Sequence, residues 1–117
     1  MRKLENISDF IVYPANRNVR IVLEAETMWS DIASIASLFN TDSETVLNQL
    51  EQLYKSKEIQ AKETISKDSY YSLYAIVAVG YRIDPKKTTE FNIWANRILR
   101  DYLLAEFLGK PKQGAET

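Results

Sequence analysis

The sequence predicts an α+β fold in a single domain over residues 1–109, and three features of the chain lead to that prediction. Near the N-terminus, two β-branched and aromatic runs flank a Pro/Asn cluster, which is typical of a β-hairpin. In the middle, two segments carry apolar residues at helical spacing behind capping residues. An apolar block and a long amphipathic stretch complete the chain, so strands should precede a helical C-terminal half.

The N-terminal hairpin is expected to join residues 10–13 to residues 19–23 through a loop of about five residues. Its second run alternates Val19, Ile21 and Leu23 with more polar neighbours, so one face should be buried. An isolated hairpin is only marginally stable. We therefore expect it to pack on the helices that follow.

Two helices are predicted next. Ser30 stands as a candidate N-cap for a first helix over residues 31–39, whose apolar positions recur at i, i+3, i+4 and i+7. Thr41 and Glu44 have the spacing of a capping box before a second helix over residues 43–55. Its expected core positions are Val46, Leu47, Leu50, Leu53 and Tyr54. A short helix, a turn of three or four residues and a longer helix are the organisation of a helix-turn-helix.

The second helix carries the candidate DNA-binding residues. With its apolar positions in the core, side chains able to hydrogen-bond bases and phosphates remain outside: Ser43, Thr45, Asn48, Gln49, Gln52 and Lys55. Any helical hairpin has a polar outer face, however, and Glu44 and Glu51 on the same helix would repel phosphates. A DNA-reading face and an ordinary solvated face both remain open.

A second hairpin, placed as a wing beside this helix, is expected from residues 59–64 and 69–72. Lys57, Lys62 and Lys67 would line its edge and contact phosphates. Lysines on an edge strand are also an ordinary guard against unwanted strand pairing.

The C-terminal third predicts two more helices. Residues 73–81 are apolar almost all round, which predicts a short buried helix that ends near Gly80. Asp84 is a candidate N-cap, with Pro85 at the first position of the next helix. Residues 89–108 form a long amphipathic helix in which Trp94 should be a buried packing anchor. Residues 110–117 read as a disordered polar tail.

Composition excludes several kinds of active site. The 117 residues contain no His and no Cys, so Ser-His-Asp and Cys-His catalysis, thiolate zinc sites and disulfides are absent. Three glycines cannot form a glycine-rich phosphate loop. We therefore expect neither enzymatic activity nor a cofactor or metal.

The net charge of −1 does not indicate a generally basic DNA binder, although residues 80–117 carry seven basic and five acidic residues, a local +2. The longest apolar run, residues 73–79, is too short to cross a membrane, and no apolar signal segment follows Met1. A cytoplasmic location is therefore expected, without membrane contact.

Four blocks of the sequence carry a resemblance to a known family: Thr27-Met28-Trp29, Ala36-Ser37-Leu38-Phe39, YYSLYAIVAVGYRI at residues 70–83 and FNIWANRILRDYL at residues 91–103. In wording and order they resemble the RhuM family of bacterial virulence-associated proteins. The likeness extends from about residue 10 to residue 108, and the chain is more weakly similar to the Bro-N type domains of phage antirepressors. The resemblance implies a DNA-associated module of mobile-element or virulence-island origin, acting as a transcriptional regulator or antirepressor.

Two functions from different classes therefore remain. The first is a winged-helix-type module that binds double-stranded DNA. The alternative is a protein–protein interaction module that docks a host or phage protein without binding nucleic acid. Homodimerisation through the helix over residues 89–108 is compatible with both.

Overall fold

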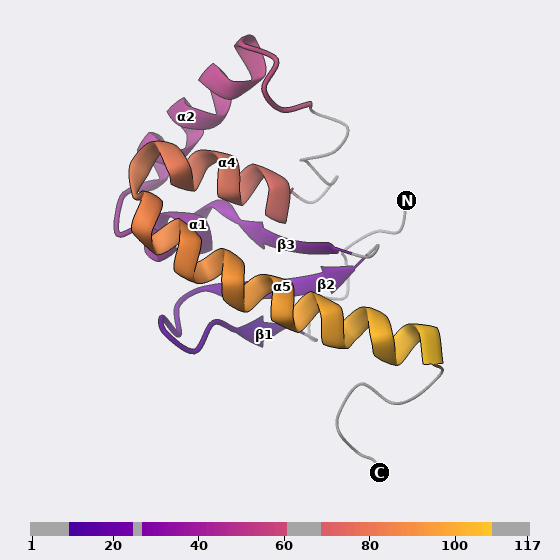
Figure 1. Cartoon of the computed structure of the whole chain (residues 1–117). Helices are drawn as coiled ribbons and strands as arrows, with labels where there is room; N and C mark the ends of the chain where they lie inside the picture. Colours follow the sequence, from indigo (N-terminus) through magenta and orange to yellow (C-terminus); the bar gives the residue numbers. More distant parts are fainter. Residues whose placement is uncertain (1–9, 25–26, 61–68, 109–117) are drawn as a thin grey trace.

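The structure, a computed structural model, describes residues 10–24, 27–60 and 69–108, with side chains described as far as residue 105. A four-stranded antiparallel sheet has the order β1-β2-β3-β4, and helices α4 and α5 both pack against β3 (Figure 1). In chain order the elements are β1 (Ile11–Val12), β2 (Arg20–Glu24), β3 (Thr27–Asp31), α1 (Ile32–Leu38), α2 (Ser43–Lys55), β4 (Tyr70–Ser72), α4 (Leu73–Ile83) and α5 (Pro85–Leu108). The α+β class predicted from the sequence is confirmed.

The predicted N-terminal hairpin is present. Ile11 pairs with Ile21 in an antiparallel ladder, and the Tyr13 N–H donates to the Val19 carbonyl oxygen at 3.0 Å to close the loop. Val19 and Ile21 are buried, as the alternation predicts. Val22 on the opposite face is buried as well, because Trp29 of β3 packs beside it.

The strand β3 was not predicted, and it corrects the start of the first helix. Ser30, expected as the N-cap, is buried in β3, where its hydroxyl donates to the Arg20 carbonyl oxygen at 2.7 Å. Asp31 is the N-cap of α1 instead, since its Oδ1 accepts from the Ser34 N–H at 2.8 Å. A carboxylate is at least as good a cap as a hydroxyl. The Ser30 hydroxyl thus links β3 to β2 instead of capping a helix.

The second predicted helix is confirmed as α2, with a different cap. Asp42, rather than Thr41, accepts from the Thr45 N–H at 2.8 Å. Hydrogen bonding to the Thr45 side chain, and then to its backbone, lowers the pKa of the Asp42 carboxyl below its ordinary value. Phe39 to Asp42 form a four-residue turn between α1 and α2, and Asn40 takes the left-handed conformation there with φ 54°.

The strand β4 pairs with β3, Trp29 lying opposite Ser72 and Asp31 opposite Tyr70. This partner differs from the one predicted for residues 69–72, namely residues 59–64. Residues 61–68 lie outside the described residues, so the wing stays a prediction. The polar tail predicted for residues 110–117 also lies outside them.

The helices α4 and α5 meet at Gly80. The predicted helix end at this residue is wrong, because α4 continues to Ile83. A β-carbon at Gly80 would stand 2.5 Å from Cζ of Phe39 and closer still to Oγ1 of Thr88. The glycine is therefore required for close packing of α4 on α1 and α5. Asp84 caps α5 as predicted, its Oδ1 accepting from the Lys87 N–H at 3.1 Å.

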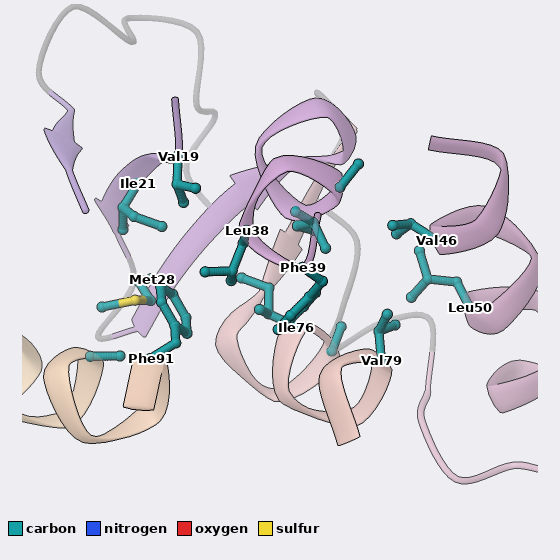
Figure 2. Packing of buried hydrophobic residues seen from close by; sticks show 14 of the residues in the cluster. Val19, Ile21, Met28, Leu38, Phe39, Val46, Leu50, Ile76, Val79 and Phe91 are labelled. Atoms are coloured by element: carbon teal, nitrogen blue, oxygen red, sulfur yellow. The ribbon is translucent and has the colours of Figure 1, made fainter. Parts of the chain in front are cut away.

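One hydrophobic core joins the sheet to all four described helices (Figure 2). Phe91 of α5 is fully buried, and its ring meets the Tyr13 ring edge-on at 5.1 Å between centroids. Trp94 is only partly buried, although it lies 4.9 Å from the Tyr13 ring. The prediction of a buried Trp94 is thus wrong, since the indole covers the margin of the core that Phe91 fills.

Candidate nucleic-acid interface

The polar residues of α2 lie on two adjoining rows of the helix surface. Val46, Leu50 and Leu53 are buried. Asn48 and Lys55 lie on the side opposite these three and are exposed; together with Glu44 and Glu51 they form what we call the outer row. Thr45, Gln49 and Gln52 follow each other along the flank that faces α4, and we call them the flank row.

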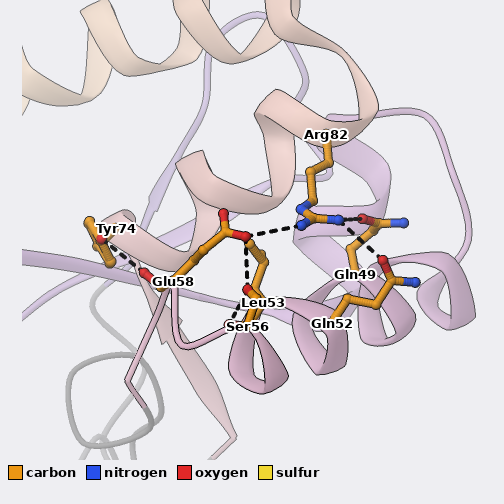
Figure 3. Close-up of polar contacts among 7 residues, drawn as sticks. All are labelled: Gln49, Gln52, Leu53, Ser56, Glu58, Tyr74 and Arg82. Carbon is orange, nitrogen blue, oxygen red and sulfur yellow. Dashed lines mark hydrogen bonds and ion pairs between the residues drawn. The ribbon is translucent and has the colours of Figure 1, made fainter.

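The flank row is bonded to α4 through Arg82. Nη1 of Arg82 donates to Oε1 of Gln49 and to Oε1 of Gln52, both at 3.2 Å (Figure 3). Two of the residues predicted to contact DNA thus share one guanidinium from a different helix. The amide oxygens of both glutamines thus already accept a hydrogen bond within the protein.

A second set of bonds holds this guanidinium in place. Nη2 of Arg82 lies 3.3 Å from Oε2 of Glu58, and that oxygen also accepts from the Ser56 hydroxyl at 2.8 Å. The Tyr74 hydroxyl donates to the Glu58 carbonyl oxygen at 3.1 Å (Figure 3). The segment after α2 is thereby fastened to both ends of α4.

The outer row keeps its groups in solvent. Asn48 is exposed, and Lys55 lies 3.7 Å from Glu51 in an i,i+4 ion pair on the surface. Lys57 is exposed just beyond the helix, where it has φ 65°. Lys62 and Lys67, predicted to line the wing, lie outside the described residues. Of the nine predicted residues, Asn48 and Lys55 thus lie on the outer row and Thr45, Gln49 and Gln52 on the flank row. Ser43 is exposed but lies in line with Leu47, on the other edge of the buried stripe.

The charge of this surface is slightly negative. Over residues 42–58 there are four carboxylates, Asp42, Glu44, Glu51 and Glu58, and two cations, Lys55 and Lys57. Arg82 adds a third cation, so three positive and four negative charges give −1. Exposed carboxylates at this density weaken attraction to phosphates.

Sequence reasoning missed Arg82 as a residue of the site. It is the sole charged side chain within α4, whose other positions are apolar, aromatic or glycine. Its own helix offers a lone cation no carboxylate or amide side chain, so any such acceptor within the protein must come from another element. That signal pointed to a contact, although the chain gave no means of naming Gln49 and Gln52 as the partners.

A second surface feature lies on α4 itself. Tyr74 and Tyr81 are 58% and 49% exposed, and partly buried Val77 and Ala78 lie between them at i+3 and i+4. These four residues form what we call the tyrosine stripe, on the side of α4 opposite its buried residues. Leu47 of α2, predicted as core, is likewise 47% exposed, because it lies at the edge of the buried stripe of α2.

Within the described ranges, no group of three or more acidic, His or Cys side chains could hold a metal ion. None of the described helices combines the length and the apolar character needed to cross a bilayer.

Comparison with known proteins places the chain in a family. The family model described as Virulence protein RhuM family matches residues 45–111, more than half of the 117-residue chain. This match includes most of α2, all of α4 and α5, and Arg82. Searches of the curated proteins and of the solved structures found no match. The chain belongs to the RhuM family of virulence proteins.

Proposed function

We propose that this RhuM protein is a DNA-binding module that reads double-stranded DNA with α2. The observation that carries the proposal is the arrangement of α1, a four-residue turn and α2, with the outer row of α2 in solvent along the whole helix. A helix held in this way can enter the major groove while its partner crosses the backbone. Action on DNA as a transcriptional regulator or antirepressor, in the cytoplasm, belongs to the same proposal.

Four polar residues of α2 and three lysines beyond it have roles in this proposal. Asn48, exposed in the middle of the outer row, can offer a donor and an acceptor to adenine. Ser43 and Thr45 lie in the first turn, where a recognition helix meets the DNA. Lys55 and Lys57 are placed to contact phosphates, and Lys62 and Lys67 are assigned the same role from the sequence.

The charge of the site limits how one copy would bind. Lys55, Lys57, Lys62 and Lys67 can supply about four phosphate contacts, which corresponds to a salt slope of about −3.6. Such a slope is shallow, so affinity must come from base contacts or from a second copy. The helix α5 offers a surface for that copy, since Ile93 and Leu104 are 59% and 50% exposed on the same face.

We propose that two copies pair α5 antiparallel across this face. Arg97 and Arg100 lie between Ile93 and Leu104. With a two-fold axis between Ile93 and Arg97, Glu90 of each copy would lie opposite Arg100 of the other. This pair of charges is then complementary, and two α2 helices would be available for two half-sites.

The tyrosine stripe supports a second candidate function, that of a protein–protein interaction module. Exposed tyrosines flanked by small apolar residues are enriched at protein interfaces, and no DNA contact requires them. In this reading a host or phage protein docks on α4, and the polar face of α2 is ordinary solvated surface.

Binding of random-sequence duplexes, followed by fluorescence anisotropy at about 50 and about 200 mM salt, decides between the two functions. The DNA-binding proposal expects binding at the lower concentration, which Lys55→Gln weakens equally for all sequences. Tyr81→Ala, in the tyrosine stripe, should leave DNA binding unchanged. Absence of duplex binding at about 50 mM salt, where phosphate contacts are strongest, would refute the proposal in favour of the interaction module.

A further inference from the structure

We propose that Arg82 is a positioning residue that turns Gln49 and Gln52 into a pair of hydrogen-bond donors, so that the flank row favours guanine over adenine. The inference rests on the proposed DNA-binding function and adds a base preference to it. It begins from the three bonds that the Arg82 guanidinium makes to Gln49, Gln52 and Glu58.

The orientation of the two amides follows from the chemistry of arginine. A guanidinium has five N–H donors and no acceptor. An amide nitrogen facing it would set donor against donor, so both glutamines must turn Oε1 toward Arg82, as they do at 3.2 Å. The NH₂ groups then point away from the guanidinium toward solvent (Figure 3). The amide orientation of both residues is thus fixed by one neighbour.

The guanidinium can impose this orientation because it is itself held. Glu58 pairs with Nη2, and the Ser56 hydroxyl and the Tyr74 hydroxyl tie down the Glu58 side chain and backbone. Arg82 also extends from α4, whose Ile76 and Val79 belong to the core. A free glutamine loses considerable rotamer entropy on binding. Here part of that loss has already occurred before DNA arrives.

A base preference follows from the fixed donors. Guanine offers two acceptors in the major groove, N7 and O6, whereas adenine offers N7 beside an N6 amino donor. The usual bidentate contact of glutamine to adenine needs the amide oxygen as an acceptor. One lone pair of that oxygen already accepts from Arg82, and the adjacent guanidinium charge repels the partial positive charge of an amino group that approaches the other lone pair. Asn48 on the outer row has no bond to Arg82 and keeps the ordinary adenine contact.

The test compares base selection from random duplexes by three proteins. Arg82→Met removes the guanidinium but keeps an apolar stem of similar length. Lys86→Met is the matched control, because it removes one exposed cation from another helix, α5. Arg82→Lys keeps the charge, although an ammonium lacks the planar fork that bridges both amides and Glu58. It replaces Arg82→Met as the test variant if the latter does not fold.

The expected result is a preference of the unaltered protein for guanine over adenine of about tenfold at one or two positions. Arg82→Met and Arg82→Lys should reduce this preference to about twofold or less. Lys86→Met should weaken binding but leave the guanine preference unchanged. If the protein binds duplexes and Arg82→Met selects the same bases as Lys86→Met, the positioning role is overturned while DNA binding stands.

A measurement without DNA tests the positioning role independently. In ¹⁵N relaxation experiments, the side-chain amides of Gln49 and Gln52 should be more ordered than the exposed amide of Asn48, and Arg82→Met should abolish the difference. Amides of Gln49 and Gln52 as mobile as that of Asn48 in the unaltered protein would overturn the inference, whatever DNA does. Ordered amides in a protein that binds no duplex would retain the clamp but overturn the guanine preference together with the proposed function.

Discussion

Replacing Gly80 by Ala should destabilise the protein, although the same change in the middle of a helix ordinarily stabilises. An alanine gains about 1 kcal/mol over glycine from helix propensity alone. At this position the new β-carbon would stand 2.5 Å from Cζ and 2.9 Å from Cε1 of Phe39, and closer to Oγ1 of Thr88. Both neighbours are buried, so neither can move into solvent.

The overlap sets the magnitude. Phe39 lies at the junction of α1 and α4, and Thr88 donates its hydroxyl to the Asp84 carbonyl oxygen at 2.8 Å at the start of α5. Overpacking of a close-packed core costs about 1–3 kcal/mol. Since the two neighbours must give way together, we take the upper part of that range. After the gain in propensity, a net loss of about 1–2 kcal/mol remains.

Urea denaturation followed by circular dichroism measures this loss, which should lower the melting temperature by about 4 °C per kcal/mol. Ala78→Gly, in the same helix, is the control and should lose about 1 kcal/mol from propensity, in addition to the contact that its methyl group makes with the core. The double variant Gly80→Ala/Thr88→Ala should recover part of the loss, because it removes the nearest atom. A Gly80→Ala protein more stable than the unaltered one would refute the packing argument.

Three further outcomes are expected. Asp42→Ala should lower the melting temperature at pH 7, because α2 loses its cap. The folded-state pKa of Asp42 lies below the ordinary 3.8, so the stability that the carboxylate contributes is present above pH 3.8 and is lost as the pH falls through the folded-state pKa. In thermal melts from pH 7 to pH 2, the melting temperatures of the variant and the unaltered protein should therefore converge at low pH. Phe91→Ala should cost about 3–5 kcal/mol in urea titrations and Trp94→Ala clearly less, an order that equal losses would contradict. Leu104→Lys should shift the mass seen by analytical ultracentrifugation from dimer to monomer, whereas Leu47→Lys should not; a monomeric unaltered protein would rule out pairing through α5.

The elements predicted correctly are those whose signals lie close together in the chain. The hairpin loop, the apolar positions of α2, and the Asp84-Pro85 start of α5 are each set by neighbours within a few residues. Capping residues and helical periodicity also predicted α1 and α2, but both N-caps were misplaced by one residue. Ser30 and Asp31, like Thr41 and Asp42, are adjacent cap formers, so the sequence could not choose between them.

The missed features depend on partners distant in the sequence. The strands β3 and β4 pair although about forty residues separate them in the sequence. Neither has a strong strand pattern of its own, so each depends on the pairing with the other. The same holds for Arg82, which meets Gln49 from 33 positions away. The partial burial of Trp94 likewise depends on how much of α5 the sheet can cover. Periodicity marks the apolar stripe but not where the coverage ends.

The pairing of β3 with β4 has a consequence for how the protein can be recombined. Asp31 and Tyr70 are register partners, so the chain leaves the sheet for α1 and returns to it within about 5.5 Å. Residues 32–69 are therefore an insertion between two neighbouring positions of the sheet. Another helical pair could replace them without changing the order of the strands. The requirement on a replacement is a surface that matches α4, where Val46 and Leu50 now share the core with Val79 (Figure 2). A chimera that meets it should keep the sheet, α4 and α5 while acquiring the recognition properties of the donor.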